Sequence, residues 1–169
     1  MPSVRLPAVA GMFYPSEQAE LHDMVLQLLR EAPETRAPVP KAIIAPHAGY
    51  IYSGPIAARA YARLAPARER ITRVVLLGPS HRVPLLGLAT SGADFFHTPL
   101  GEIPLDRTSI ESIEALPQVK RLEAAHQMEH SLEVHLPFLQ EVLGSFTLIP
   151  LVVGDATPEQ TAEVLEHLW

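Results

Sequence analysis

Cysteine is absent from the 169 residues of this sequence. Without a thiol the chain forms no disulfide, thiolate metal site or cysteine nucleophile of its own, so a bound metal must take nitrogen and oxygen ligands. No apolar run approaches the roughly 18 residues of a membrane-spanning helix. The N-terminal segment also lacks an apolar stretch of signal-peptide length. We therefore expect a soluble, cytoplasmic protein with no membrane partner.

Positive charge is also scarce, with 13 Lys and Arg against 19 Asp and Glu and a formal net charge of −6. The sequence has no basic run of the kind that binds a phosphate backbone, so nucleic acid is not an expected partner. The zinc-protease H-E-x-x-H pattern, the G-x-S-x-G elbow, the Walker loop and the dinucleotide-binding glycine fingerprint are missing as well. The sequence therefore predicts none of these enzyme classes.

Apolar residues make up 47% of the chain, enough for a single domain with a hydrophobic core over residues 1–169. Short, wholly apolar runs at 42–45, 74–77 and 147–153 are typical of strands buried on both faces. Amphipathic helices separate these runs, which predicts an α/β fold with a mostly parallel sheet flanked by helices. Residues 86–106 alternate short apolar runs with turn signals and predict a small antiparallel excursion.

Helix signals occupy the intervals between the apolar runs. Thr108 and Thr157 are each followed, three residues later, by Glu or Gln, which is the pattern of a capping box at a helix start. Pro137 lies within a leucine stripe and should kink the helix that carries it. Helices are therefore predicted after Ser16, over 55–64, after Thr108, over 129–143 and after Thr157.

Two of the predicted strands end in similar sequences, Ile44-Ala45-Pro46-His47 and Leu77-Gly78-Pro79-Ser80-His81. Ligands of open parallel sheets bind beyond the carboxyl ends of the strands, so His47 and His81 should face each other in one crevice. Imidazole is a common transition-metal ligand, and one shared metal would hold the two ring nitrogens roughly 3 to 4 Å apart. The alternative is that each histidine hydrogen-bonds only within its own loop.

The segments around the two histidines carry candidate ligand-binding residues. Gly49 allows the backbone to approach a ligand closely, Tyr50 and Tyr52 can line the wall, and Ser80 lies beside His81. We predict Gly49, Tyr50, Tyr52 and Ser80 as cofactor-binding residues. In the alternative, the glycine only serves a turn and the tyrosines pack beneath it.

A further polar cluster, Glu129-His130, opens the helix predicted over 129–143. His130 is a candidate general acid or base and Glu129 a candidate to orient it, so these two are the predicted catalytic residues. Glu133 can reach the same helix face, whereas His135 points elsewhere and is expected to be packed or paired. The remaining histidines are expected on the solvated surface: His22, His97, His126 and His167.

Several blocks, in a fixed order along the chain, carry a resemblance to a known family. The blocks are 7–15 (PAVAGMFYP), 42–49 (AIIAPHAG), 50–54 (YIYSG), 77–81 (LGPSH), 129–137 (EHSLEVHLP) and 149–154 (IPLVVG). With them the sequence closely resembles the Memo-like family, whose bacterial members are called AmmeMemoRadiSam system protein B. The resemblance spans essentially the whole chain.

The resemblance implies an α/β fold related to the class III extradiol ring-cleaving dioxygenases, in which two histidines and a third ligand hold a non-haem metal. His47 and His81 fall on the two histidine ligands, so the implied cofactor is a transition metal, with iron or copper favoured and zinc as the alternative. The third ligand of the family is a cysteine beyond residue 169, so the chain is expected to lack a C-terminal part. Leu165 and Trp169 should then mark an exposed apolar surface.

Two classes of function remain open. The first is a metal-dependent oxidoreductase with a dioxygenase-like pocket that holds iron or copper. The second is a non-catalytic module that binds metal or a peptide, because a shared fold does not guarantee a shared function. Zinc in the same pocket would instead favour hydrolysis. The expected occupant of the pocket is a small molecule or peptide, and the family name adds association with a radical S-adenosylmethionine protein.

Overall fold

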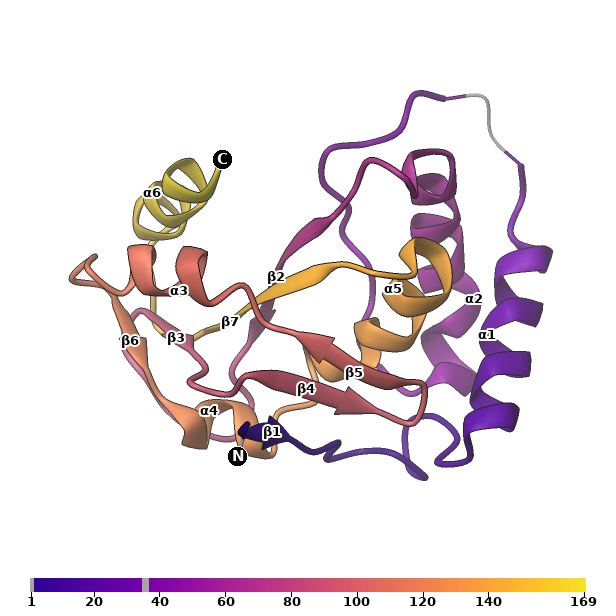
Figure 1. Cartoon of the computed structure of the whole chain (residues 1–169), viewed down its shortest axis with the longest axis horizontal. Helices are drawn as coiled ribbons and strands as arrows, with labels where there is room; N and C mark the ends of the chain where they lie inside the picture. The colour runs from indigo at the N-terminus through magenta and orange to yellow at the C-terminus, as the bar shows by residue number, and fades with distance from the viewer. Residues whose placement is uncertain (1, 35–36) are drawn as a thin grey trace.

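The computed structural model describes residues 2–34 and 37–169. Figure 1 shows a mixed α/β arrangement in which helices lie on both sides of a central pair of strands, β2 and β7. Among the described residues, no helix combines the length and the apolar character that crossing a membrane requires.

The larger sheet confirms the predicted α/β fold with a mostly parallel sheet. β2 pairs with β7 and β3 pairs with β6 in parallel, whereas β3 pairs with β7 in the antiparallel sense. β7 is an inner strand whose Leu148, Ile149 and Leu151 are fully buried, as expected for a strand covered on both faces. In the order β2-β7-β3-β6, the strands are Arg73–Pro79, Thr147–Val153, Leu88–Thr90 and Val119–Arg121.

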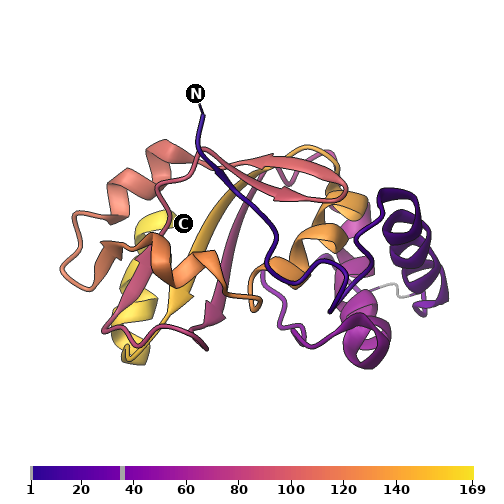
Figure 2. The same cartoon turned by 90° about the horizontal axis from the view of Figure 1, so that it is seen from below.

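The smaller sheet contains β1 (Val4–Arg5), β4 (Phe95–Thr98) and β5 (Gly101–Pro104). β4 and β5 form an antiparallel hairpin, which confirms the excursion predicted within 86–106. β1 pairs with β4 in parallel, so the N-terminal segment passes beside this hairpin (Figure 2).

The helices form two groups on opposite sides of β2 and β7 (Figures 1 and 2). The first group packs together through aromatic side chains: Tyr50 and Tyr61 of α2 both contact Phe138 of α5, with ring centroids 5.0 and 5.3 Å apart. This group comprises α1 (Gln18–Glu31), α2 (Tyr50–Tyr61), the short 3-10 helix η1 (Ala62–Ala67) and α5 (Leu136–Leu143). The second group comprises α3 (Arg107–Ile113) and α6 (Pro158–Leu168). Two further short helices, α4 (Glu123–Gln127) and the 3-10 helix η2 (Glu133–His135), lie along the connection from β6 to α5.

The strand predicted at 42–45 does not form. The segment is irregular, and the side chain of Ile44 is 100% exposed. A β-strand needs a neighbouring strand for its backbone hydrogen bonds, and no strand among residues 2–34 and 37–169 pairs with this segment. The prediction was wrong because an apolar run indicates only that the segment suits a buried strand. It does not indicate whether a second strand is present to pair with it.

Several predicted helix starts also need correction. α2 begins at Tyr50 and not near Pro55, because Phe13 accepts the first helical N–H at 2.8 Å. Asp106, and not Thr108, caps α3 by accepting a hydrogen bond from the Ser109 N–H at 3.0 Å.

Two other helix predictions concern a proline and a capping residue. Pro137 does not kink a long helix. It lies in the first turn of α5, where a backbone N–H would have no acceptor within the helix, so the proline breaks no helical hydrogen bond. α1 begins after Glu17 without a side-chain cap, so Ser16 has no capping role. The capping box of Thr157 with Gln160 at the start of α6 is confirmed.

Candidate metal centre

Three histidines from distant segments converge at one end of β2. His81 lies two residues after the end of β2, His47 lies in the irregular segment before α2, and His130 lies between α4 and η2. One ring nitrogen from each lies within 4.8 Å of the other two. The ring centroids of His81 and His130 are 4.6 Å apart, and those of His47 and His81 are 5.4 Å apart. His47 and His81 therefore lie close together, and His130, which the sequence predicts as a proton carrier, lies beside them. The prediction of one shared crevice is not confirmed, because His47 and His130 line one cavity and His81 lines another.

The segment that carries His47 is fixed by the start of α2. Ser53 Oγ donates to the carbonyl of Ala48 at 2.8 Å, and Gly49 is the N-cap residue of the helix. The Tyr50 N–H donates to Phe13, whose ring lies 4.9 Å from that of His130. Phe13 of the N-terminal segment therefore contacts both the start of α2, which follows His47, and the ring of His130.

A close backbone approach brings His130 to the end of β2. A Cβ added to Gly78 would lie 2.7 Å from Ser131 Oγ, so only glycine leaves room for Ser131 at its present position. Ser131 Oγ in turn donates to the carbonyl of Pro79 at 2.9 Å. The glycine in the Leu77–His81 sequence thus serves to seat the neighbouring loop, a role that the sequence motif alone did not reveal.

Glu129 orients His81 from beneath the cluster. Its buried carboxylate accepts the His81 Nδ1–H at 2.8 Å and the His81 backbone N–H at 2.6 Å. It also accepts the backbone N–H groups of His130 and Ser131, each at 2.9 Å. With Nδ1 protonated towards the carboxylate, the lone pair of His81 Nε2 is free for a metal. Burial raises the pKa of Glu129, but these hydrogen bonds outweigh it and hold the pKa at about 2.

The surroundings of His47 and His130 favour the neutral imidazole, which is the form that binds a metal. Burial lowers the pKa of His47, and the neighbouring His81 lowers it further. Burial likewise lowers the pKa of His130. Its Nδ1 is inaccessible to solvent and makes no hydrogen bond within the described residues, although Glu129 Oε1 lies 3.5 Å away. Neutral imidazoles of this kind, one of them with a buried nitrogen that makes no hydrogen bond, fit a transition-metal ligand set.

The structure separates the four predicted cofactor-binding residues. Gly49 and Tyr52 line the cavity beside His47, and the Tyr52 side chain is 80% exposed. Tyr50 is buried and donates its hydroxyl to the carbonyl of Val134 at 2.7 Å, so it packs beneath the site. Ser80 donates its hydroxyl to the carbonyl of Val83 at 2.5 Å and shapes its own loop.

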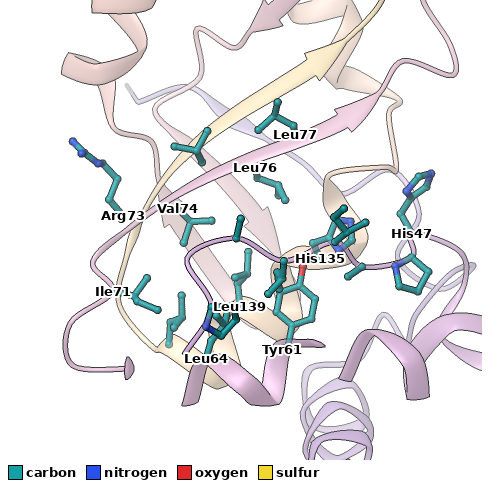
Figure 3. Close-up of a pocket in the computed structure, with 18 of the residues that line it drawn as sticks. His47, Tyr61, Leu64, Ile71, Arg73, Val74, Leu76, Leu77, His135 and Leu139 are labelled. Carbon is teal, nitrogen blue, oxygen red and sulfur yellow. The ribbon is translucent and has the colours of Figure 1, made fainter. Parts of the chain in front are cut away.

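Glu133 and His126 lie where the sequence did not predict them, whereas His135 is packed as predicted. Glu133 does not face the crevice: it is buried and bonded to the Arg5 guanidinium at 2.5 Å. His126 is buried and not on the surface, with Nε2 3.0 Å from the carbonyl of Ala89. His135 is buried, but it does not point elsewhere: it lines the same groove as His47 (Figure 3). Its ring centroid lies 6.4 Å from that of His47, outside the three-histidine cluster.

A long groove leads away from the cluster between β2 and the segment 39–49. In Figure 3, Val74 and Leu76 extend from β2 towards Tyr61, Leu64 and Leu139, and His47 lies at one end. The groove encloses about 2120 Å³ and is lined mainly by apolar side chains.

The chain is similar to a set of known proteins. Residues 5–169 match the family described as Memo-like protein. A MEMO1 family protein from Aquifex aeolicus is 42% identical and one from Methanocaldococcus jannaschii is 38% identical, over 89% and 97% of this chain. The rat protein MEMO1 is 35% identical over 91% of this chain. The matches span 55%, 62% and 52% of these three relatives, so the chain covers only part of their length. The family match runs through every segment that builds the cluster, and the chain belongs to the Memo-like protein family.

Proposed function

We propose that this protein binds a transition metal through the imidazoles of His47, His81 and His130. The observation that carries the proposal is the convergence of one nitrogen from each ring within 4.8 Å. Metal–nitrogen bonds near 2 Å require closer nitrogens, so binding would draw the rings together by on the order of 1 Å.

The donor set suits iron, copper or zinc, all of which imidazole binds. When bound, iron or copper would supply redox chemistry and zinc would supply a Lewis acid. The residues of this chain would hold the site: Glu129 fixes the ring of His81, and the apolar groove walls restrict water near His47. In this proposal His130 is a third metal ligand. This role replaces the proton transfer that the sequence predicts for His130.

The finer proposal is a metal-dependent oxidoreductase with iron or copper and a dioxygenase-like pocket. The alternative is a non-catalytic module that binds metal or a peptide. One observation favours this alternative: the groove of about 2120 Å³ exceeds the roughly 300–1,000 Å³ of typical small-ligand pockets. A groove of this size suits a polypeptide segment better than a small substrate.

Metal titration of the metal-free chain tests the proposal. Fe²⁺ under anaerobic conditions, Cu²⁺ and Zn²⁺ are each titrated into the wild type and into His47→Ala, His81→Ala and His130→Ala. Each substitution should weaken binding about 100-fold or more, because first-sphere ligands contribute more than the 10- to 100-fold of outer contacts. His167→Ala is the matched control, since His167 is exposed on α6 and outside the cluster. Unchanged affinity in both His47→Ala and His81→Ala would refute the site.

Metal content and oxygen uptake separate the two finer proposals. The protein is purified anaerobically, its metal is measured, and dioxygen consumption is followed with the metal-loaded chain and a reductant. Bound iron or copper with oxygen uptake that disappears in His81→Ala supports the oxidoreductase. Tight metal binding without any uptake supports the non-catalytic module.

A further inference from the structure

The loop that carries His130 has no regular secondary structure of its own. Residues 128–132 lie between the end of α4 at Gln127 and the start of η2 at Glu133, in neither a helix nor a strand. The buried backbone groups of such a segment cannot be paired by a helix or a sheet and need other partners. The position of His130 therefore depends on the side chains that bind this loop from outside.

Arg5 binds the loop at both ends and in its middle. Its Nε donates to the carbonyl of His126, in the last turn of α4, at 3.1 Å. Its Nη2 donates to the carbonyl of Glu129 at 2.6 Å, and its Nη1 donates to the Glu133 carboxylate at 2.5 Å. Arginine can make all three bonds because its planar guanidinium presents five N–H groups in a fixed fork. The side chain is buried, which strengthens these bonds relative to the same bonds in water.

Arg5 is itself fixed by the smaller sheet. Its backbone pairs with Phe96 of β4, and its guanidinium carbon lies 5.4 Å from the centroid of the Phe96 ring. Phe96 is fully buried. Both the backbone and the side chain of Arg5 are therefore held by β4, which lies outside the loop.

Glu129 connects this arginine to the histidine cluster. Its carbonyl accepts from Arg5, while its carboxylate accepts the Nδ1–H and the backbone N–H of His81. The same carboxylate accepts the backbone N–H of His130, the next residue in the chain. A shift of the Glu129 backbone would therefore move its carboxylate away from His81 and the His130 ring away from the cluster.

We propose that Arg5 is a positioning residue for the histidine cluster. It holds the backbone of Glu129 where the carboxylate orients His81 and where the ring of His130 lies beside it. The inference rests on the proposed metal site, because a metal requires its ligands within about 0.5 Å of their productive positions. Arg5 acts through Glu129 and does not bind the metal, since a guanidinium offers no lone pair.

Two substitutions separate positioning from stability. Arg5→Lys keeps a positive charge beside Glu133. Its compact ammonium cannot reproduce the fork that reaches the carbonyls of His126 and Glu129 together. Arg5→Met removes both the charge and the fork. Ile110→Ala is the matched control: Ile110 is buried in α3, which supplies no residue to the cluster, and its truncation destabilises the core by leaving a cavity.

The first measurement uses the metal-free folded chain. Nitrogen-15 NMR gives the tautomer of His81, which should be Nδ1–H in the wild type and in Ile110→Ala. This preference should be weakened in Arg5→Lys and lost in Arg5→Met.

The second measurement is a Zn²⁺ titration of the same four proteins. Arg5→Lys should weaken binding about tenfold and Arg5→Met about 100-fold, which is the range for contacts that orient a ligand. Denaturant unfolding gives the stability of each protein, so that affinities are compared between variants of similar stability.

The outcomes are distinct. A changed His81 tautomer and weaker Zn²⁺ binding in the Arg5 variants, with both kept in Ile110→Ala, support the proposal. If Arg5→Met does not fold, Arg5→Lys alone decides. The wild-type tautomer or the wild-type affinity in the folded Arg5 variants overturns the proposal, as does an equal loss in Ile110→Ala. A wild-type chain that binds no Zn²⁺ counts against the metal site, and the tautomer in the metal-free chain then decides the role of Arg5.

Discussion

Glu129 makes contacts that a surface carboxylate does not make, because four N–H groups around the histidine cluster point at its two oxygens. Carboxylates that hold a metal-binding histidine typically contribute 10- to 100-fold to metal affinity. We predict that Glu129→Leu, which leaves no acceptor for the His81 Nδ1–H, weakens metal binding within that range and removes the Nδ1–H preference of His81. Titration gives the affinity, and nitrogen-15 NMR gives the tautomer. An unchanged tautomer would show that Glu129 only supports the loop.

His126 should make stability depend on pH. Burial lowers its pKa to about 4 in the folded protein, against 6.5 for an exposed imidazole. Below pH 6.5 the unfolded chain binds a proton that the folded chain refuses until about pH 4. The free energy of unfolding should therefore fall as the pH decreases between these values, by about 1.4 kcal/mol per pH unit at most for this residue.

The variant His126→Gln isolates this effect, since the amide can still donate to Ala89. Denaturant unfolding between pH 7 and 4 should show a smaller decrease in stability for the variant than for the wild type. Buried His135, with a pKa lowered to about 4 by burial, keeps part of the dependence in both proteins. The exposed His167→Ala serves as control, and a slope equal in all three proteins would contradict the prediction.

The positions of single residues could be predicted from the sequence where they depend only on neighbouring residues in the chain. His47 and His81 were found because each follows a short apolar run and a proline. Tyr50 was misplaced because its burial depends on Phe138 and Val134, which come from a distant segment. His130 was predicted as a catalytic residue, which stays a prediction. Its place in the three-histidine cluster depends on the packing of Ser131 against Gly78, which no local sequence pattern predicts.

At the scale of elements, a buried ionic network joins the N-terminal segment to the loop before α5. Glu133 accepts from Arg5, from the Tyr14 hydroxyl at 2.6 Å and from the Ala8 N–H at 2.7 Å. Arg5 also donates to the carbonyl of Glu129 at 2.6 Å. The network thus ties residues 5–14 to the loop that carries the third histidine.

Breaking this network should cost much more than breaking a surface pair. We predict that Glu133→Gln lowers the free energy of unfolding by about 3 kcal/mol, because it leaves the Arg5 charge buried without its partner. Glu111→Gln, which removes an exposed pair with Arg107, should cost less than about 0.5 kcal/mol. Urea unfolding of both variants measures the difference. If both variants lost an equally small amount of unfolding free energy, the buried ion pair between Arg5 and Glu133 would not stabilise the fold.

Two of the apolar runs that were predicted as buried strands, 42–45 and 147–153, should differ in how much a truncated side chain destabilises the fold. Ile149 is fully buried in β7, so Ile149→Ala should cost about 3 kcal/mol. Ile44 is fully exposed, so Ile44→Ala should cost less than about 0.5 kcal/mol. Unfolding at low protein concentration provides the comparison. A loss above about 2 kcal/mol for Ile44→Ala would mean that the 42–45 run is buried in solution.

The elements show why sequence reasoning succeeded in one region and failed in another. β2 and β7 were predicted because strand and partner both lie in the described chain. The run at 42–45 has the same composition but lacks a pairing strand there, and composition cannot report a partner's presence. Helix starts shifted for a similar reason: Phe13, distant in sequence, fixes the start of α2.

At the scale of the whole molecule, the same segments form both the histidine cluster and the walls of the groove. The end of β2 supplies His81, its open edge forms one groove wall, and the segment that forms the other wall supplies His47. The apolar cluster around β7 and the two helix groups hold these parts in place. Membership of the Memo-like family agrees with this arrangement, since the match covers both walls and all three histidines.

Anomalous diffraction from crystals loaded with Zn²⁺ tests the central claim most directly, because it locates the metal without reference to activity. The account predicts one strong peak about 2.1 Å from a nitrogen of each of His47, His81 and His130. In crystals of His81→Ala grown under the same conditions the peak should be absent or greatly reduced. A wild-type map with no peak among the three rings, or with its strongest protein-bound peak elsewhere, would contradict the account.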